Sequence, residues 1–173
     1  MAHAVHEGSN GFTVAVRSVV SVWALIGGMV LLAVVVVNMA SVIGGMFGHP
    51  FPGDFELTEI GVAIAAFAFL PYCQVVGANV TADIFTSAAS PRWVAFLTML
   101  GGIVALLFTL VLIWRMYFGM LDQKAYNYTT AILQIPHWIA YAVILVSLAL
   151  LVLAALATIV EEGTAMKNGG GHV

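Results

Sequence analysis

The thirteen charged side chains of this chain fall into a few clusters, and four uncharged stretches separate the clusters. These stretches lie between Arg17 and Asp54, Glu59 and Asp83, Arg92 and Arg115, and Lys124 and Glu161. A helix rises about 1.5 Å per residue and the hydrocarbon core of a bilayer is about 30 Å thick, so about 20 apolar residues cross it. The pattern therefore predicts an all-α integral membrane protein with four transmembrane helices.

The composition excludes several other classes of protein. Hydrophobic residues make up 62% of the 173 residues and charged residues 8%, and a soluble domain could not cover so much apolar surface. The net charge of −3 and the lack of a Lys/Arg run exclude a nucleic-acid partner and leave membrane lipid as the expected surroundings. Cys73 is the only cysteine, which excludes an intramolecular disulfide and a cysteine-rich metal site.

We expect helices at about residues 18–43, 59–77, 93–117 and 136–160. The first apolar run is much longer than the core of a signal peptide, which favours a retained span. These boundaries predict a cytoplasmic N-terminal segment at 1–17, a four-helix membrane domain at 18–160 and a flexible cytoplasmic tail at 161–173. Residues 119–135 mix polar and apolar side chains, and we expect them to lie along the membrane interface.

The loop at residues 44–58 indicates the orientation of the chain. It is rich in glycine and proline and carries acidic residues but no Lys or Arg. Under the positive-inside rule it faces away from the cytoplasm, and with four spans both termini are then cytoplasmic. Small residues four positions apart, such as Gly61 and Ala65, permit two helices to approach closely.

Polar chemistry within the spans is sparse. Asn38 and Gln74 are the main polar side chains there, whereas a channel or carrier usually keeps ionisable groups near the middle of the membrane. Glu56 and Glu59 stand at the start of the second helix, where carboxylates complement the helix N-terminus, and this explanation is preferred to proton coupling by Glu59.

The ends of the spans carry the expected interfacial residues. We expect Arg115 to extend its charge from the third helix to the interface. Tryptophan rings favour the same depth of the membrane, and the candidates are Trp93, Trp114 and Trp138.

The five histidines are candidate haem ligands, because four-helix membrane anchors often carry haem between facing axial ligands. Only His137, at the start of the fourth helix, is placed to ligate, and it has no intramembrane histidine partner. No nucleophile, phosphate-loop or zinc motif is present. The sequence therefore predicts no enzyme, no catalytic, substrate-binding or metal site and no cofactor.

Five features follow one another along the chain: Asn38, Phe55 to Glu59, Ala78 to Phe85 with Asp83, Arg92, and Thr130 to Tyr141. Their order resembles that in one transporter family, the small membrane subunit of tripartite ATP-independent periplasmic (TRAP) transporters. That family typically has a glutamate at the start of its second helix and a His-x-x-x-Asp pattern at its end. Here Asn79 takes the histidine position, so no role requiring a titratable group is assigned there.

The resemblance implies a subunit of a sodium-coupled secondary transporter, a symporter, in a prokaryotic inner membrane. A large membrane subunit would carry the elevator-type transport domain and the sodium sites, and a periplasmic solute-binding protein would capture the solute, commonly an organic acid. The small subunit would brace the immobile scaffold. We expect four charged residues to anchor helix ends to lipid headgroups or to the partner subunit: Glu56, Glu59, Asp83 and Arg92.

Two alternatives stay open at this point. The chain could be the membrane anchor of a respiratory oxidoreductase, which would require haem or quinone and a soluble redox partner. It could also be an autonomous small carrier in which Glu59 or Asp83 couples protons. The absence of histidines and acids from the interior of the spans counts against both.

Overall fold

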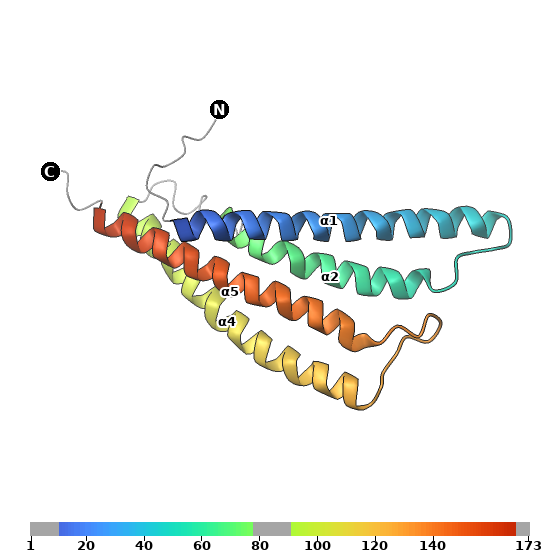
Figure 1. The fold of residues 1–173 in the computed structure, drawn as a ribbon. Coiled ribbons are helices and arrows are strands. Elements are labelled where there is room, and N and C mark those ends of the chain that lie inside the picture. The colour runs from blue at the N-terminus through green and yellow to red at the C-terminus, as the bar shows by residue number, and fades with distance from the viewer. Residues whose placement is uncertain (1–10, 78–90, 169–173) are drawn as a thin grey trace.

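The computed structural model describes residues 11–77 and 91–168. These residues form four helices (Figure 1), and each is long and apolar enough to cross a membrane. The predicted all-α, four-span fold class is confirmed. The helices are α1 (Gly11–Met46), α2 (Asp54–Val75), α4 (Pro91–Ala125) and α5 (His137–Asn168).

The helices form two hairpins that meet through α5. α1 packs along α2 to make the first hairpin, and α4 packs along α5 to make the second. α5 also packs along α2 and, over a shorter stretch, against α1. The α1–α2 and α4–α5 loops lie at the same end of the molecule, whereas α1 begins and α5 ends at the opposite end (Figure 1).

All four helices extend beyond the bounds expected from the sequence, and α2 does so at its start, at Asp54 instead of residue 59. α1 contains 36 residues, about 54 Å at 1.5 Å per residue, and it continues through Arg17 to begin at Gly11. α4 continues to Ala125, so residues 119–125 are helical, and α5 includes residues 161–168, which the sequence predicts to be part of a flexible tail. Charged residues end a hydrophobic stretch without ending a helix, because helical backbone hydrogen bonds do not depend on hydropathy. The domain boundaries themselves stay a prediction.

Glycines permit α1 and α2 to approach closely. A Cβ atom at Gly27 of α1 would lie 2.7 Å from Ala68 Cβ of α2, and a Cβ atom at Gly61 of α2 would collide with the side chain of Val34. Ala65 is also buried, so the spacing of Gly61 and Ala65 does mark a helix contact. Such close contacts add van der Waals attraction, which replaces the hydrophobic effect between helices in lipid.

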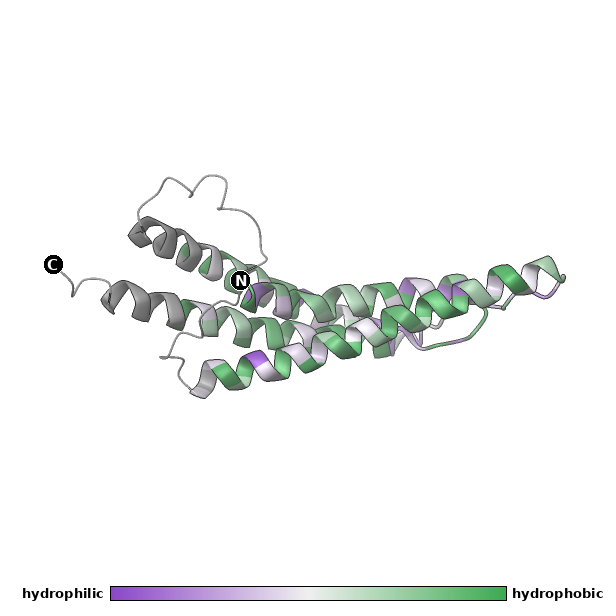
Figure 2. Ribbon diagram, turned by 90° about the horizontal axis from the view of Figure 1, so that it is seen from above, coloured by the Kyte–Doolittle hydropathy of each residue, from purple (hydrophilic) through white to green (hydrophobic). Residues whose placement is uncertain are grey.

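Much of the outer surface of the bundle is apolar. Figure 2 shows hydrophobic residues along all four helices. On α1 alone, Leu25, Met29 and Leu32 expose 69%, 71% and 64% of their surface. A patch of this extent is unfavourable in water and is the ordinary surface of a span that faces lipid or another membrane protein.

Candidate functional site

The densest set of polar contacts between distant parts of the chain lies where the two interhelical loops meet. We call this set the loop-end joint. It joins the end of α1, the start of α2 and the α4–α5 loop through these residues: Ser41, Gly53, Asp54, Glu56, Thr130, Ile132 and Leu133.

Glu56 connects the two hairpins directly. Its Oε1 atom accepts a hydrogen bond from the Ile132 N–H at 2.7 Å, and its Oε2 atom accepts one from the Leu133 N–H at 2.9 Å. A carboxylate is suited to this position because both of its oxygens accept, and hydrogen bonds to an ionised acceptor are stronger than neutral ones. One side chain in the first turn of α2 therefore holds two consecutive amides of a loop 76 and 77 positions away in sequence.

The α4–α5 loop has a defined shape that presents those amides. The Thr130 N–H donates to the Ile135 carbonyl at 3.0 Å, and the Ile135 N–H donates to the Thr130 hydroxyl oxygen at 3.0 Å. The His137 N–H donates to the Tyr128 carbonyl at 3.1 Å, which closes the base of the loop. Gln134 has a positive φ of 54°, a conformation that turns the chain back toward α5.

Gly53 provides the space that the joint requires. It has a φ of 81°, in the left-handed region that favours glycine, and stands immediately before α2. A Cβ atom there would lie 2.5 Å from Leu133 Cγ. Leu133 therefore makes both contacts, because its side chain packs over Gly53 and its backbone amide donates to Glu56.

Asp54 and Thr58 connect the start of α2 to α1. The Ser41 hydroxyl donates to Asp54 Oδ2, while Asp54 Oδ1 accepts from the Phe55 N–H at 2.8 Å. One turn further along α2, the Thr58 hydroxyl oxygen accepts from Asn38 Nδ2 at 2.6 Å. These bonds fix the axial position of α1 along α2 as well as the distance between the two helices.

A second polar contact between the hairpins lies deeper in the bundle. Trp23 Nε1 of α1 donates to the hydroxyl of Ser147 on α5 at 2.9 Å. That hydroxyl in turn donates to the Val143 carbonyl at 3.2 Å. Ser147 is 1% exposed, so this contact is enclosed by the helices.

The charged residues singled out from the sequence are divided between the two ends of the bundle. Glu56 is in the loop-end joint, and Glu59 is exposed one turn further along α2. Arg92 is in the first turn of α4, at the opposite end, although its side chain is not among those described. Asp83 lies outside the described residues. The predicted anchoring role of these four residues stays a prediction.

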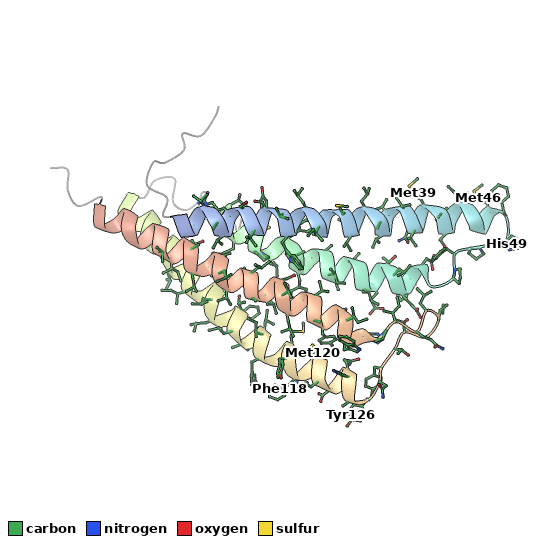
Figure 3. All side chains as sticks on the ribbon, in the orientation of Figure 1. Met39, Met46, His49, Phe118, Met120 and Tyr126 are labelled. Atoms are coloured by element: carbon green, nitrogen blue, oxygen red, sulfur yellow. The ribbon has the colours of Figure 1, made fainter. Side chains whose placement is uncertain are left out.

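The predicted interfacial residues lie on α4 and α5. Arg115 is exposed, and Trp114 is 66% exposed with its ring edge-on to Phe118, which points away from the bundle (Figure 3). Trp138 lies beneath Lys124, whose Nζ is 5.6 Å from the ring centroid. Trp93 is in the first turn of α4, and its side chain is not described.

Asp54, Ser41 and the tip of the α4–α5 loop were not identified from the sequence. Asp54 carries a recognisable signal, because acidic residues are favoured in the first turn of a helix. The loop amides carry none, since every residue except proline has one. Among the described residues, no three His, Cys, Asp or Glu side chains are grouped to hold a metal ion. The contacts of the loop-end joint connect α2 to α1 and to the α4–α5 loop.

One family profile matches the chain, that of "Tripartite ATP-independent periplasmic transporters, DctQ component", over residues 33–164. This range is about three quarters of the chain and contains the whole loop-end joint. The chain belongs to this family. As a DctQ protein it is the small membrane component of a TRAP transporter, and it is a multi-pass membrane protein. Among curated proteins and among solved structures, no match to the chain was found.

The range matched by the DctQ profile divides α1 into two parts. It begins at Ala33, so the first 22 residues of α1 precede it, while α2, α4 and most of α5 lie within it. The predicted resemblance to the TRAP small subunit is confirmed, including the segments that contain Glu56, Glu59, Asp83 and Arg92.

Proposed function

We propose that this DctQ chain is the accessory scaffold subunit that braces the large transport subunit of a TRAP transporter. In the complete system, the large subunit performs sodium-coupled symport of an organic acid that a periplasmic binding protein delivers. The observation that carries the proposal is the attachment of the two hairpins by Glu56, because a brace must resist relative motion of its own parts. Trp23 and Ser147 restrain the same hairpins deeper in the bundle.

The placement of polar groups supports bracing over transport by this chain alone. Asn38, Thr58 and Ser147, which lie within the candidate spans, are engaged in contacts between helices. Residues 18–53, 60–82 and 125–160 contain no charged side chain that could bind an ion or an organic acid within the membrane. The substrate and sodium sites are therefore assigned to the large subunit.

We place the chain in the inner membrane of a prokaryote with both termini in the cytoplasm. The described chain begins and ends at the same end of the bundle, which supports a common side for the termini (Figure 1). The loop-end joint then faces the periplasm, where the solute-binding protein delivers its cargo. The α1–α2 loop, residues 47–53, carries no Lys or Arg, in agreement with the positive-inside rule.

Transport in proteoliposomes tests the proposed function. Vesicles would contain the large subunit with or without this chain, with binding protein and a radiolabelled organic acid outside. We expect uptake only when both membrane subunits are present and sodium is higher outside, with a potassium gradient as control. Full uptake without this chain, or uptake by this chain alone, would contradict the proposal.

A further inference from the structure

The uncharged stretches of α1 and α4 are displaced from each other along the bundle. One cross-section passes through Trp23 of α1, Ser147 of α5 and Ile113 of α4. Trp23 donates to Ser147, and Ile113 packs against the buried α5 side chains on either side of Ser147. From this level toward the loops, α1 continues uncharged to Met46, over about 34 Å at 1.5 Å per residue. In the same direction α4 reaches a charged residue, Arg115, only two positions after Ile113.

Toward the ends of the chain the displacement is reversed. α1 reaches Arg17 only six positions before Trp23, whereas α4 runs uncharged from Leu112 back to Trp93, over about 30 Å. The uncharged stretch of α1 is therefore centred on the loop side of the cross-section, and that of α4 on the opposite side. Figure 1 agrees, because α1 extends beyond the loop ends of α4 and α5.

A bilayer perpendicular to α1 cannot contain both stretches. If its boundary lay at the level of Lys124, more than three turns of α1 would project beyond it, with Val42 and Met46 exposing 70% and 82% of their surface. Such a patch is unfavourable in water. If the hydrocarbon instead extended to Met46, it would enclose Arg115, Asp122 and Lys124, and each charge within hydrocarbon costs free energy.

We infer that the bilayer crosses the bundle obliquely, so that α1 is steeply tilted and the exposed side chains near its loop end, such as Met39 and Val42, contact lipid acyl chains. The uncharged part of α1, residues 18–46, is about 43 Å long, and a tilt of about 40° reduces its span to about 33 Å. The uncharged part of α4, residues 93–114, has about that length without tilt. Both spans then match a hydrocarbon core of about 30 Å.

The polar residues near the loops fit the same plane. α2 packs against both α1 and α5, so an oblique boundary crosses it at an intermediate level, close to its first turns with Glu56 and the exposed Glu59. On α4 the boundary passes near Trp114 and Arg115, an indole ring and a guanidinium that both favour the interface. The α1–α2 and α4–α5 loops then share one boundary although they are displaced along the bundle. This orientation concerns the chain itself and holds whatever its role in transport.

Spin labels in vesicles that contain the full chain test the orientation. Cys73→Ala would remove the native thiol, and single cysteines would replace Ala40 or Phe118, which are both exposed. Ala40 is 17 positions past Trp23 and Phe118 is five past Ile113, so Ala40 lies about 18 Å further toward the loops along the bundle. The depth of each label follows from its relaxation by oxygen, which concentrates in hydrocarbon, and by a nickel chelate, which stays in water.

The oblique plane predicts equal depths for the two labels. We expect both to lie in hydrocarbon and to agree within about 5 Å, one helical turn. Labels at Val104, near the middle of the uncharged part of α4, and at Tyr126 in the α4–α5 loop would calibrate the deep and aqueous limits. If the nickel chelate reaches position 40 as readily as position 126 while position 118 is protected, α1 is upright and the inference is wrong. Leu121→Cys would repeat the measurement on α4 if circular dichroism shows that Phe118→Cys is misfolded.

Discussion

The α1–α2 hairpin is held by different interactions along its length and at its loop end. Along the helices, Gly27 and Gly61 permit backbone approach and form contacts without polar atoms. At the loop end, Asp54 accepts a hydrogen bond from the Ser41 hydroxyl and the Thr58 hydroxyl oxygen accepts one from Asn38, while Glu56 attaches the hairpin to the α4–α5 loop. Apolar contacts alone do not fix how far one helix is shifted along another in lipid, because a side chain that leaves the helix contact meets lipid tails that are equally apolar. The directional bonds at the end therefore set the register that the small residues alone would leave open.

The largest effect is expected from filling the close contact at Gly27. Gly27→Leu places a side chain where a Cβ would already lie 2.7 Å from Ala68 Cβ, whereas Gly28 has no such neighbour within 4 Å. Both substitutions raise helix propensity equally, so their difference isolates packing. We expect Gly27→Leu to be about 1–3 kcal/mol less stable than Gly28→Leu, measured by unfolding in mixed micelles. Equal stabilities would show that α1 and α2 are not in close contact there.

The next largest effect is expected at Glu56. In Glu56→Gln one end of the side chain becomes an NH₂ group, which faces an amide N–H and cannot accept a hydrogen bond from it. We expect the thermal unfolding midpoint to fall by a few degrees, with faster hydrogen exchange at Ile132 and Leu133. Glu59→Gln is the matched control, because Glu59 is exposed one turn away on the same helix. An equal fall of the unfolding midpoint in Glu59→Gln would indicate that removing any negative charge from the start of α2 lowers stability, independent of the bonds to the loop.

The same substitution connects stability to transport. If the joint braces the large subunit, Glu56→Gln lowers sodium-driven uptake in reconstituted vesicles, while Glu59→Gln leaves it near the unsubstituted rate. Uptake would be compared at equal amounts of incorporated complex, so that poor assembly is not counted as poor transport. If uptake is normal although hydrogen exchange shows that the α4–α5 loop is loosened, the loop-end joint does not contribute to bracing.

The sequence predicted the four spans and the family but not the contacts of the joint. Hydrophobic stretches between charges are local and can be counted, so the spans could be located without a structure. The partner of Glu56 could not be found in this way, because Ile132 and Leu133 contribute only their backbone amides. The true ends of α4 and α5 could not be predicted for a different reason. Charged residues end the hydrophobic run while the helix continues, Asp122 and Lys124 in α4 and Glu161 and Glu162 in α5.

A smaller effect is expected from the buried contact between Trp23 and Ser147. Trp23→Phe removes the indole N–H that donates to the Ser147 hydroxyl, and Ser147→Ala removes the acceptor. A double-mutant cycle should give a coupling of about 0.6 kcal/mol, the average for hydrogen bonds between transmembrane helices. This value would place the contact below the joint and the glycine contacts in importance. A coupling near zero would show that the two side chains act independently.

The smallest effect is expected where α4 and α5 meet on the exposed side of their loop. Lys124 Nζ lies 5.6 Å from the centroid of the Trp138 ring, and Trp138 is 37% exposed. An exposed cation–π contact contributes about 0.5 kcal/mol, and arginine can replace lysine in it. We therefore expect Lys124→Gln to be less stable than Lys124→Arg by about that amount, and the difference to vanish when Trp138 is replaced by leucine. If the difference persists with leucine at position 138, the charge of Lys124 stabilises the C-terminal end of α4 through the helix dipole instead. The α4–α5 loop would then depend on Glu56 for its attachment and on its own backbone hydrogen bonds for its shape.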